Sequence, residues 1–201
     1  ANDFFKSWAA KKVENGAPLV IGQHGGNFGT NTFSFDEDHQ IKIAHKWLSW
    51  GWSDSKRSKI LAASNLKVVI HTLDYNPAGG ALMVEMTMPR YSYHLYAVPI
   101  SRQWLDYLDD QHLFLRALQK VLRRKVLLRL FPHDFGWDQI DRWKDQMPEI
   151  QLNDGHDNIL SLIKNSRLYI TTYNSTTCLE SLSWNIPTIM FWNPTHWELN
   201  E

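Results

Sequence analysis

The sequence is poor in cysteine, in net charge and in long apolar runs, and each shortage excludes a class of protein. Cys178 is the only cysteine among 201 residues, so no disulfide framework can form within the chain and a reducing compartment is expected. It lies in an apolar-periodic stretch, so we expect its thiol to be buried and inert. Lys plus Arg and Asp plus Glu are 21 each, so no summed charge concentrates the chain on nucleic acid or an anionic membrane. No apolar run approaches the ~18 residues of a membrane span, and no signal peptide begins the chain. We expect a cytoplasmic protein without a transmembrane segment.

Several sequence signatures of catalysis are also missing. The patterns GxxxxGK[ST], GxGxxG and GxSxG do not occur, which disfavours nucleotide hydrolases, dinucleotide oxidoreductases and serine hydrolases. The acidic run 36–39 is present, but consecutive side chains at a helix start point in different directions, and the helix dipole favours acidic residues there. No second cluster has metal-ligand spacing, so we expect no metal site.

What the chain does contain is enough apolar material for a packed core. Hydrophobic residues make up 43% of it and include ten tryptophans, which indicates a globular protein. Its length suits one α/β domain. The chain does not begin with Met and stops soon after the apolar run 188–192. We therefore expect 1–201 to be a single domain from a longer protein with a further amino-terminal domain.

Apolar runs of strand length alternate with segments of helical periodicity. Strands are predicted at 19–21, 66–73, 81–88, 126–131, 149–152, 167–173 and 187–192. Helices are predicted at 35–50, 102–124, 137–146, 157–166 and 176–184. The turn-rich segment 76–80 predicts a hairpin or a loop, and 89–99 predicts a loop over the sheet edge. This alternation predicts an α/β fold, a Rossmann-like open parallel sheet with helices on both faces.

Three loops that follow predicted strands carry unusual polar residues. They are Gln-His-Gly-Gly at 23–26, Pro-His-Asp at 132–134 and Asn-Ser-Thr-Thr at 174–177. In an open parallel sheet, ligands bind beyond the carboxyl ends of the strands. We therefore expect the three loops to emerge on the same edge of the sheet.

The loop 174–177 allows two interpretations. Thr177 and Glu180 have the spacing of a capping box, in which a hydroxyl and a carboxylate satisfy backbone amides at a helix start. The same helix start offers free N–H groups and a positive dipole end, which bind phosphate oxygens. The hydroxyls of Ser175 and Thr176 would add neutral donors. Spacing alone leaves both interpretations open.

The other two loops are equally ambiguous. His24 precedes Gly25 and Gly26, which permit close approach of a ligand, so it could act as a general base, as a phosphate donor or as a simple turn residue. Arg129 lies within an apolar run and needs a partner, either a core carboxylate or a ligand anion. His133 follows Pro132, which restricts its backbone.

Three motifs together resemble a known group of enzymes. The segments QHGG at 23–26, RLFPHDFGW at 129–137 and SRLYITTYNSTTCLESLSWNIPTIMFWNP at 166–194 are similar to the carboxyl-terminal, donor-binding half of GT-B-type transferases of bacterial surface-carbohydrate synthesis. A more distant similarity links them to CDP-glycerol glycerophosphotransferases and to sialyl- and Kdo-type transferases that use CMP-sugars. The resemblance extends from about residue 22 to residue 194, and the Asn-Ser-Thr-Thr stretch is its most specific part.

The resemblance implies a role for each matching residue. Ser175 and Thr176 would bind the donor phosphate, His24 would be the catalytic base in the cleft, and Glu180 would meet the ribose or sugar unless it only caps the helix. His133 would face the donor nucleotide phosphate, and Thr177 lies beside the serine/threonine pair. From the loops themselves we also predict donor or phosphate binding by Gly25, Gly26, Arg129 and Asn174. Relatives more often have His-Pro where this chain has Pro132-His133.

The resemblance also implies a reaction. A sugar or polyol phosphate would pass from a nucleotide-activated donor to a carbohydrate or lipid-linked acceptor, in the cytoplasm or at the inner membrane face, with no cofactor beyond the nucleotide-sugar substrate. The isolated chain would be inactive without its amino-terminal domain. A non-catalytic α/β interaction or structural domain is the alternative, and an epimerase or phosphoesterase on the same kind of sheet is a third hypothesis.

Overall fold

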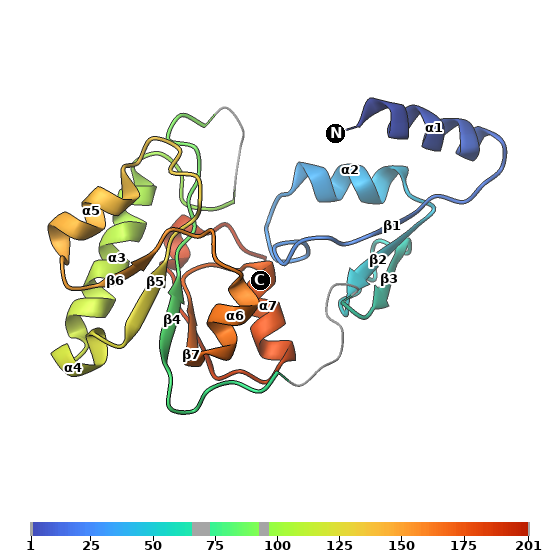
Figure 1. Ribbon diagram of the computed structural model, residues 1–201. Coiled ribbons are helices and arrows are strands. Elements are labelled where there is room, and N and C mark those ends of the chain that lie inside the picture. The colour runs from blue at the N-terminus through green and yellow to red at the C-terminus, as the bar shows by residue number, and fades with distance from the viewer. Residues whose placement is uncertain (1, 66–72, 93–96, 201) are drawn as a thin grey trace.

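A computed structural model describes residues 2–65, 73–92 and 97–200, and it confirms an α/β fold built on parallel strands (Figure 1). The strands within these ranges are β1 (Val20–Gly22), β2 (Lys46–Trp50), β3 (Ile60–Ala63), β4 (Gly80–Val84), β5 (Val126–Arg129), β6 (Gln151–Asn153), β7 (Ser166–Thr171) and β8 (Thr188–Met190). The helices are α1 (Asp3–Glu14), α2 (Phe35–Ile43), α3 (Gln103–Ala117), α4 (Lys120–Arg123), α5 (Gln139–Gln146), α6 (Ile159–Lys164), α7 (Thr176–Ser183) and the 3₁₀ turn η1 (Pro194–His196).

The larger sheet has five parallel strands in the order β6-β5-β4-β7-β8. From β4 the chain winds outward through β5 and β6 on one side, and then returns to add β7 and β8 on the other. The strand order therefore reverses between β4 and β7, which is the doubly wound, Rossmann-like arrangement. Loops that follow these two strands open into the crevice where such sheets bind ligands.

Alternating side chains bury the two faces of this sheet against different helices (Figure 1). Met83 and Leu128 point to the face covered by α3 and α5, where Trp104 and Trp143 complete a large aromatic core. The opposite face is covered by α6 and α7, and Leu82 is among the strand residues buried there. Residues on both faces are apolar because a parallel sheet between two helical layers has no solvated side.

Cys178 confirms the expectation of a buried thiol. It lies in α7, is 3% exposed and packs in the cluster beneath the sheet. Burial raises the pKa of its thiol to about 11, so the thiolate is scarce at neutral pH.

The predicted helix over 102–124 is interrupted. Leu118 and Gln119 adopt extended backbone conformations, which divide the segment into α3 and α4. Leu118 packs against the core cluster from this position. The helical spacing of the leucines did not reveal the break, because Leu118 packs on the core although it lies outside a helix.

The smaller sheet has three parallel strands in the order β1-β2-β3. The prediction of one helix over 35–50 is wrong in its second half, since α2 ends at Ile43 and Trp47 lies in β2. Ile41 and Trp47 belong to one buried cluster, so their helix-like spacing reflects a helix packed on a neighbouring strand. Strand β3 was not predicted, and β4 ends at Val84, short of the predicted 81–88.

Two predicted segments fall partly outside the described ranges. The strand predicted at 66–73 involves residues 66–72. The segment 76–80 is described and forms a turn before β4, in which the Gly79 amide donates to the Asn76 carbonyl at 2.9 Å. The loop predicted at 89–99 involves residues 93–96. In the part of the chain that the structure describes, no helix is long and apolar enough to cross a membrane.

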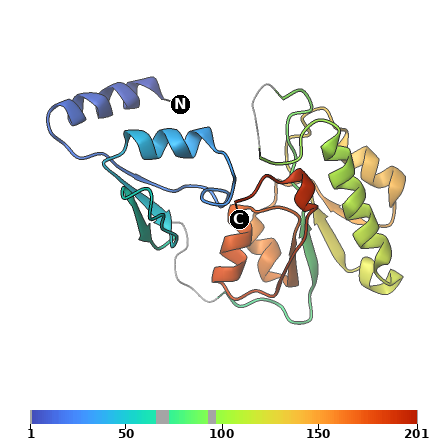
Figure 2. The same cartoon turned by 180° about the vertical axis from the view of Figure 1, so that it is seen from behind.

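The two sheets meet through the carboxyl-terminal segment, which runs back beside the loop after β1 (Figure 2). Asn31 forms an antiparallel bridge with Leu199, and the Thr32 amide donates to the Glu198 carbonyl at 2.8 Å. The Asn200 amide donates to the Thr30 carbonyl at 2.8 Å. That 1–201 is one domain of a longer protein stays a prediction.

Candidate functional site

A cavity of about 390 Å³ lies where the two sheets face each other at the carboxyl ends of β4 and β7. Among the described residues, none of the side chains that line it is charged. Its lining residues are Gly26, Asn27, Met86, Thr87, Met88, Val98, Phe131, Tyr173, Asn174, Ser175, Thr176, Thr177 and Trp197. The cavity therefore occupies the switch point of the larger sheet and includes the whole 174–177 loop.

The start of α7 forms one wall of this cavity. Ser175 is the N-cap, with an extended backbone, and its Oγ accepts a hydrogen bond from the Cys178 amide at 3.1 Å. The predicted cap at Thr177 is wrong, because Thr177 already lies within the helix and cannot take the extended conformation of a cap. Glu180 is correspondingly too far into the helix to complete a capping box.

The same wall presents unused hydrogen-bond donors. Among the described residues, the backbone amides of Thr176 and Thr177 donate to no acceptor. The Thr177 hydroxyl also has no partner there, whereas Thr176 Oγ1 accepts from the Gly26 amide at 3.1 Å. The helix start therefore aims free N–H and O–H groups, together with the positive end of the helix dipole, at the cavity.

Gly26 brings the loop after β1 into contact with α7. A Cβ atom at Gly26 would lie 2.7 Å from the backbone of Ser175 and Thr176, so only glycine permits this approach. Asn174 strengthens the contact, because its Nδ2 donates to Thr30 Oγ1 at 2.9 Å. The two loops that the sequence predicted as neighbours thus do meet, although they come from different sheets.

Two further polar atoms in the cavity wall are buried and unpaired within the described ranges. Thr87 follows β4 and is 6% exposed, and its Oγ1 has no hydrogen-bond partner. Trp197 follows η1 and is 3% exposed, and its Nε1 has none either. Buried polar groups in proteins are normally satisfied, so unpaired ones that line a cavity point to a ligand.

A hydrogen-bonded network from α3 supports the floor of the cavity. The Tyr107 hydroxyl accepts from the Met86 amide at 2.9 Å and contacts the Thr172 hydroxyl, which in turn donates to the Val84 carbonyl at 2.9 Å. Burial raises the pKa of Tyr107 well above its usual value, and nearby Glu85 adds to the effect. This network joins the ends of β4 and β7 directly beneath the site.

Glu85 is a buried acid beside this floor. It follows β4 directly, is 1% exposed, and its Oε2 accepts from Trp143 Nε1 at 2.6 Å. Burial raises the pKa of Glu85 to about 8; the hydrogen bond from Trp143 opposes this shift, and the Asp134 charge adds to it. Glu85 is therefore largely protonated at neutral pH.

The predicted site residues divide into two groups. The cavity brings together Gly26, Asn174, Ser175, Thr176 and Thr177. The others, which do not line it, are His24, Gly25, Arg129, His133 and Glu180. Their roles in catalysis or donor binding stay predictions.

The histidines lie outside the cavity. His24 is exposed and its ring packs edge-on against Phe28, with the ring centroids 4.8 Å apart. His133 is exposed between the rings of Phe131 and Phe135, at centroid distances of 6.2 and 5.9 Å. His24 also follows β1 of the smaller sheet, so the three loops do not share one sheet edge as predicted.

Arg129 is held by backbone carbonyls. Its Nη2 donates to the carbonyls of Gly155 and Asp157, and no carboxylate pairs with it among the described residues. Burial raises the pKa of the Tyr173 phenol, and the hydrogen bond with the Ser175 hydroxyl and the Arg129 charge oppose this shift. Arg129 therefore contributes positive potential from behind the Tyr173 wall of the cavity.

Sequence reasoning missed the part of the site that follows β4. The run 81–88 is mostly apolar and predicts one strand, but the strand ends at Val84, and Met86 and Thr87 leave the sheet and line the cavity. Trp197 follows the carboxyl-terminal turn η1, and no recognisable sequence motif around it indicates a role in a site. Within the described ranges, no group of three or more His, Cys, Asp or Glu side chains is placed to hold a metal ion.

Comparison with known protein families shows to which family the chain belongs. Residues 1–201 match the family described as LIC12162 family transferase over the whole chain. The chain belongs to this transferase family. A search of curated proteins found no match. Membership in the LIC12162 family supports a transferase activity in general, and it is consistent with a neutral, donor-rich cavity at the switch point of a Rossmann-like sheet.

Proposed function

We propose that this LIC12162 family member is a glycosyltransferase-like enzyme that binds a nucleotide-activated sugar or polyol donor at the start of α7. The donor phosphate would accept hydrogen bonds from the amides and hydroxyls of Thr176 and Thr177. The observation that carries the proposal is the cavity at the β4–β7 switch point, lined by unused donors of α7. Helix starts of this kind bind phosphate without any charged side chain.

The unpaired polar atoms of the cavity support a bound ligand. Trp197 Nε1 can only donate a hydrogen bond, and Thr87 Oγ1 can donate or accept one. A phosphate offers acceptors to both. The ligand would thus satisfy groups from α7, from the segment after β4 and from the carboxyl-terminal turn.

The proposed chemistry is group transfer with a nucleotide phosphate as leaving group. An acceptor hydroxyl would attack the anomeric carbon, or the phosphorus of a polyol-phosphate donor, and the bond to the leaving phosphate would break. Negative charge grows on the leaving oxygens, where preorganised donors are worth roughly 2.7–4 kcal/mol each in comparable sites. A general base must take the acceptor proton, and His24 remains the predicted residue for that role.

The cleanest test replaces Thr177 with valine. The Thr177 hydroxyl makes no hydrogen bond with the described residues, so Thr177→Val removes a ligand donor and keeps the side-chain shape. We expect binding of nucleoside monophosphates and diphosphates, measured by calorimetry, to weaken about tenfold or more, since a hydrogen bond to a charged group is worth about 1.5–3 kcal/mol. The melting temperature should stay close to that of the unmodified protein.

Two further variants separate binding from helix capping. Ser175→Ala removes a cap and should lower stability by about 1 kcal/mol in addition to weakening binding. Ser183→Ala changes the same residue type at the other end of α7, where the hydroxyl donates to the Leu179 carbonyl at 2.8 Å, and should leave binding unchanged. If no nucleotide binds, or if Thr177→Val binds nucleotide normally, the loop only caps its helix and the non-catalytic alternative is favoured.

A further inference from the structure

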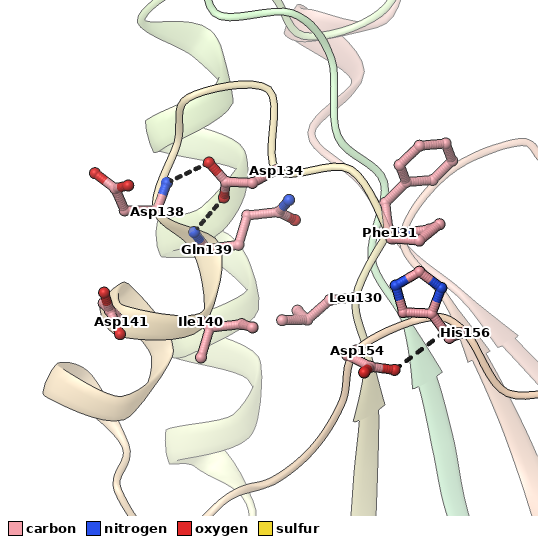
Figure 3. Close-up of a pocket in the computed structure, with 10 residues that line it drawn as sticks. Leu130, Phe131, Asp134, Asp138, Gln139, Ile140, Asp141, Asp154 and His156 are labelled. Atoms are coloured by element: carbon pink, nitrogen blue, oxygen red, sulfur yellow. Dashed lines mark hydrogen bonds between the residues drawn. The ribbon is translucent and has the colours of Figure 1, made fainter.

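A second cavity, of about 330 Å³, opens at the carboxyl ends of β5 and β6 (Figure 3). Its walls come from the segment after β5, the start of α5 and the turn after β6. Phe131 lines this cavity and also the cavity at the start of α7. Phe131 therefore belongs to the walls of both cavities, and a ligand held at α7 would reach the second one past this side chain.

Gln139 presents an unused acceptor in the second cavity. Its side chain is 2% exposed, and its Oε1 has no hydrogen-bond partner among the described residues. Its Nε2 faces the His133 carbonyl at 3.5 Å, which orients the amide so that the oxygen stays free. Figure 3 shows this side chain reaching from the start of α5 toward Phe131. A buried, unpaired oxygen at this position calls for a ligand that donates a hydrogen bond.

The other polar groups around Gln139 are also mostly acceptors. Asp134 accepts from the amides of Asp138 and Gln139 at 2.9 and 2.6 Å (Figure 3). It also accepts from the Gly136 amide at 3.0 Å. Partial burial acts to raise the pKa of Asp134, but these backbone hydrogen bonds outweigh it and lower the pKa, so the carboxylate stays ionised. The remaining carboxylates of the cavity are Asp138, Asp141 and Asp154. Such a wall repels carbonyl oxygens and attracts N–H groups.

The apolar part of the cavity suits a flat ring. Leu130, Phe131 and Ile140 line it alongside the acceptors. A nucleobase has apolar faces and a polar edge, so its faces can pack on these side chains while its edge meets Gln139.

We propose that the second cavity holds the base of the donor nucleotide and that Gln139 Oε1 accepts a hydrogen bond from an exocyclic amino group. This inference rests on the proposed function of the α7 cavity. The protein would then prefer cytosine and adenine over uracil and hypoxanthine. The latter two present a carbonyl oxygen where the amino group would be, and that oxygen would face acceptors.

The test uses two pairs of nucleotides in which a carbonyl replaces the exocyclic amino group and the adjacent ring nitrogen gains a hydrogen. For the whole chain, calorimetry should give a dissociation constant about tenfold lower for CMP than for UMP, and likewise for AMP than for IMP, since an unmet hydrogen bond at a buried acceptor has this order of effect. In Gln139→Met, both ratios should fall toward one. The hydrogen bond from the Gln139 backbone amide to Asp134 does not depend on the side chain, so the loop should persist.

The control is Gln146→Met, the same substitution at the other end of α5. Gln146 Oε1 accepts from Arg116 Nη2 at 2.8 Å outside the cavity, so the base preference should be retained. Equal affinities of the unmodified protein for amino and keto bases would overturn the inference without any substitution, as would an unchanged ratio in Gln139→Met. Nucleotide binding that depends on Thr177 but shows no base preference would overturn only this inference. Absence of any nucleotide binding would overturn the proposed function as well.

Discussion

Replacing Glu85 with glutamine should make the protein less sensitive to alkaline pH. Glu85 lies in the core beside the floor of the α7 cavity, and burial raises its pKa to about 8 from the ordinary 4.5. Between these two values the folded protein holds a proton that the unfolded chain releases. The stability from the neutral carboxyl is thus fully present below pH 4.5 and is lost as the pH rises through about 8.

The size of the effect follows from the difference between the two pKa values. That difference corresponds to roughly 5 kcal/mol between pH 4.5 and pH 9, as an upper bound. In Glu85→Gln, the amide oxygen can still accept from Trp143 Nε1, and the side chain at position 85 no longer titrates. The variant should therefore match the unmodified protein near pH 4.5 and exceed its stability by several kcal/mol, up to about 5, at pH 9.

Urea unfolding at pH values from 4.5 to 9 would measure this difference. Other titrating groups are common to both proteins and cancel when the two free energies of unfolding are subtracted. Glu14→Gln changes an exposed side chain of α1 and should follow the profile of the unmodified protein at every pH. A difference between Glu85→Gln and the unmodified protein that is constant across this pH range would refute a buried, protonated Glu85.

Two other substitutions test the contacts that build the cavities. Gly26→Ala should weaken nucleotide binding and cost about 1–3 kcal/mol of stability, because its Cβ would meet rigid backbone at 2.7 Å. Gly25→Ala, whose Cβ would meet only the side chain of Asn27 at 2.9 Å, should cost much less in the same unfolding and calorimetry measurements. Asp134→Asn should lower stability at pH 7 but not near pH 2, since a depressed pKa gives stability that is lost as the pH falls. Equal losses for the two glycines, or the same loss for Asp134→Asn at both pH values, would contradict these explanations.

Much of the larger sheet could be read from the sequence. The apolar runs around Leu128 and Ile170 are strands, and the segments 137–146 and 157–166 contain α5 and α6. Such runs are visible because a parallel strand covered by helices on both faces must be apolar throughout. The helical spacing of Trp47 was misleading for a different reason: β2 packs on α2, so apolar residues of the strand and of the helix belong to one buried cluster.

The binding site was predictable only in part. The polar loop 174–177 stands out between apolar runs, and all four of its residues line the cavity. Which hydroxyl caps α7 was not predictable, because Ser175 and Thr177 both fit cap chemistry and the backbone angle decides between them.

The parallel α/β class, the buried thiol of Cys178 and the polar loop at the start of α7 could be predicted from the sequence alone, because these features depend on local patterns of apolar and polar residues. The division of the strands into two sheets and the contact of Gly26 with α7 are apparent only in the folded protein, as is the burial of Glu85 and Gln139 with an oxygen unpaired among the described residues. These features depend on contacts between residues far apart in the chain. No local pattern encodes such contacts, and they decide where hydrogen-bonding groups remain free for a ligand.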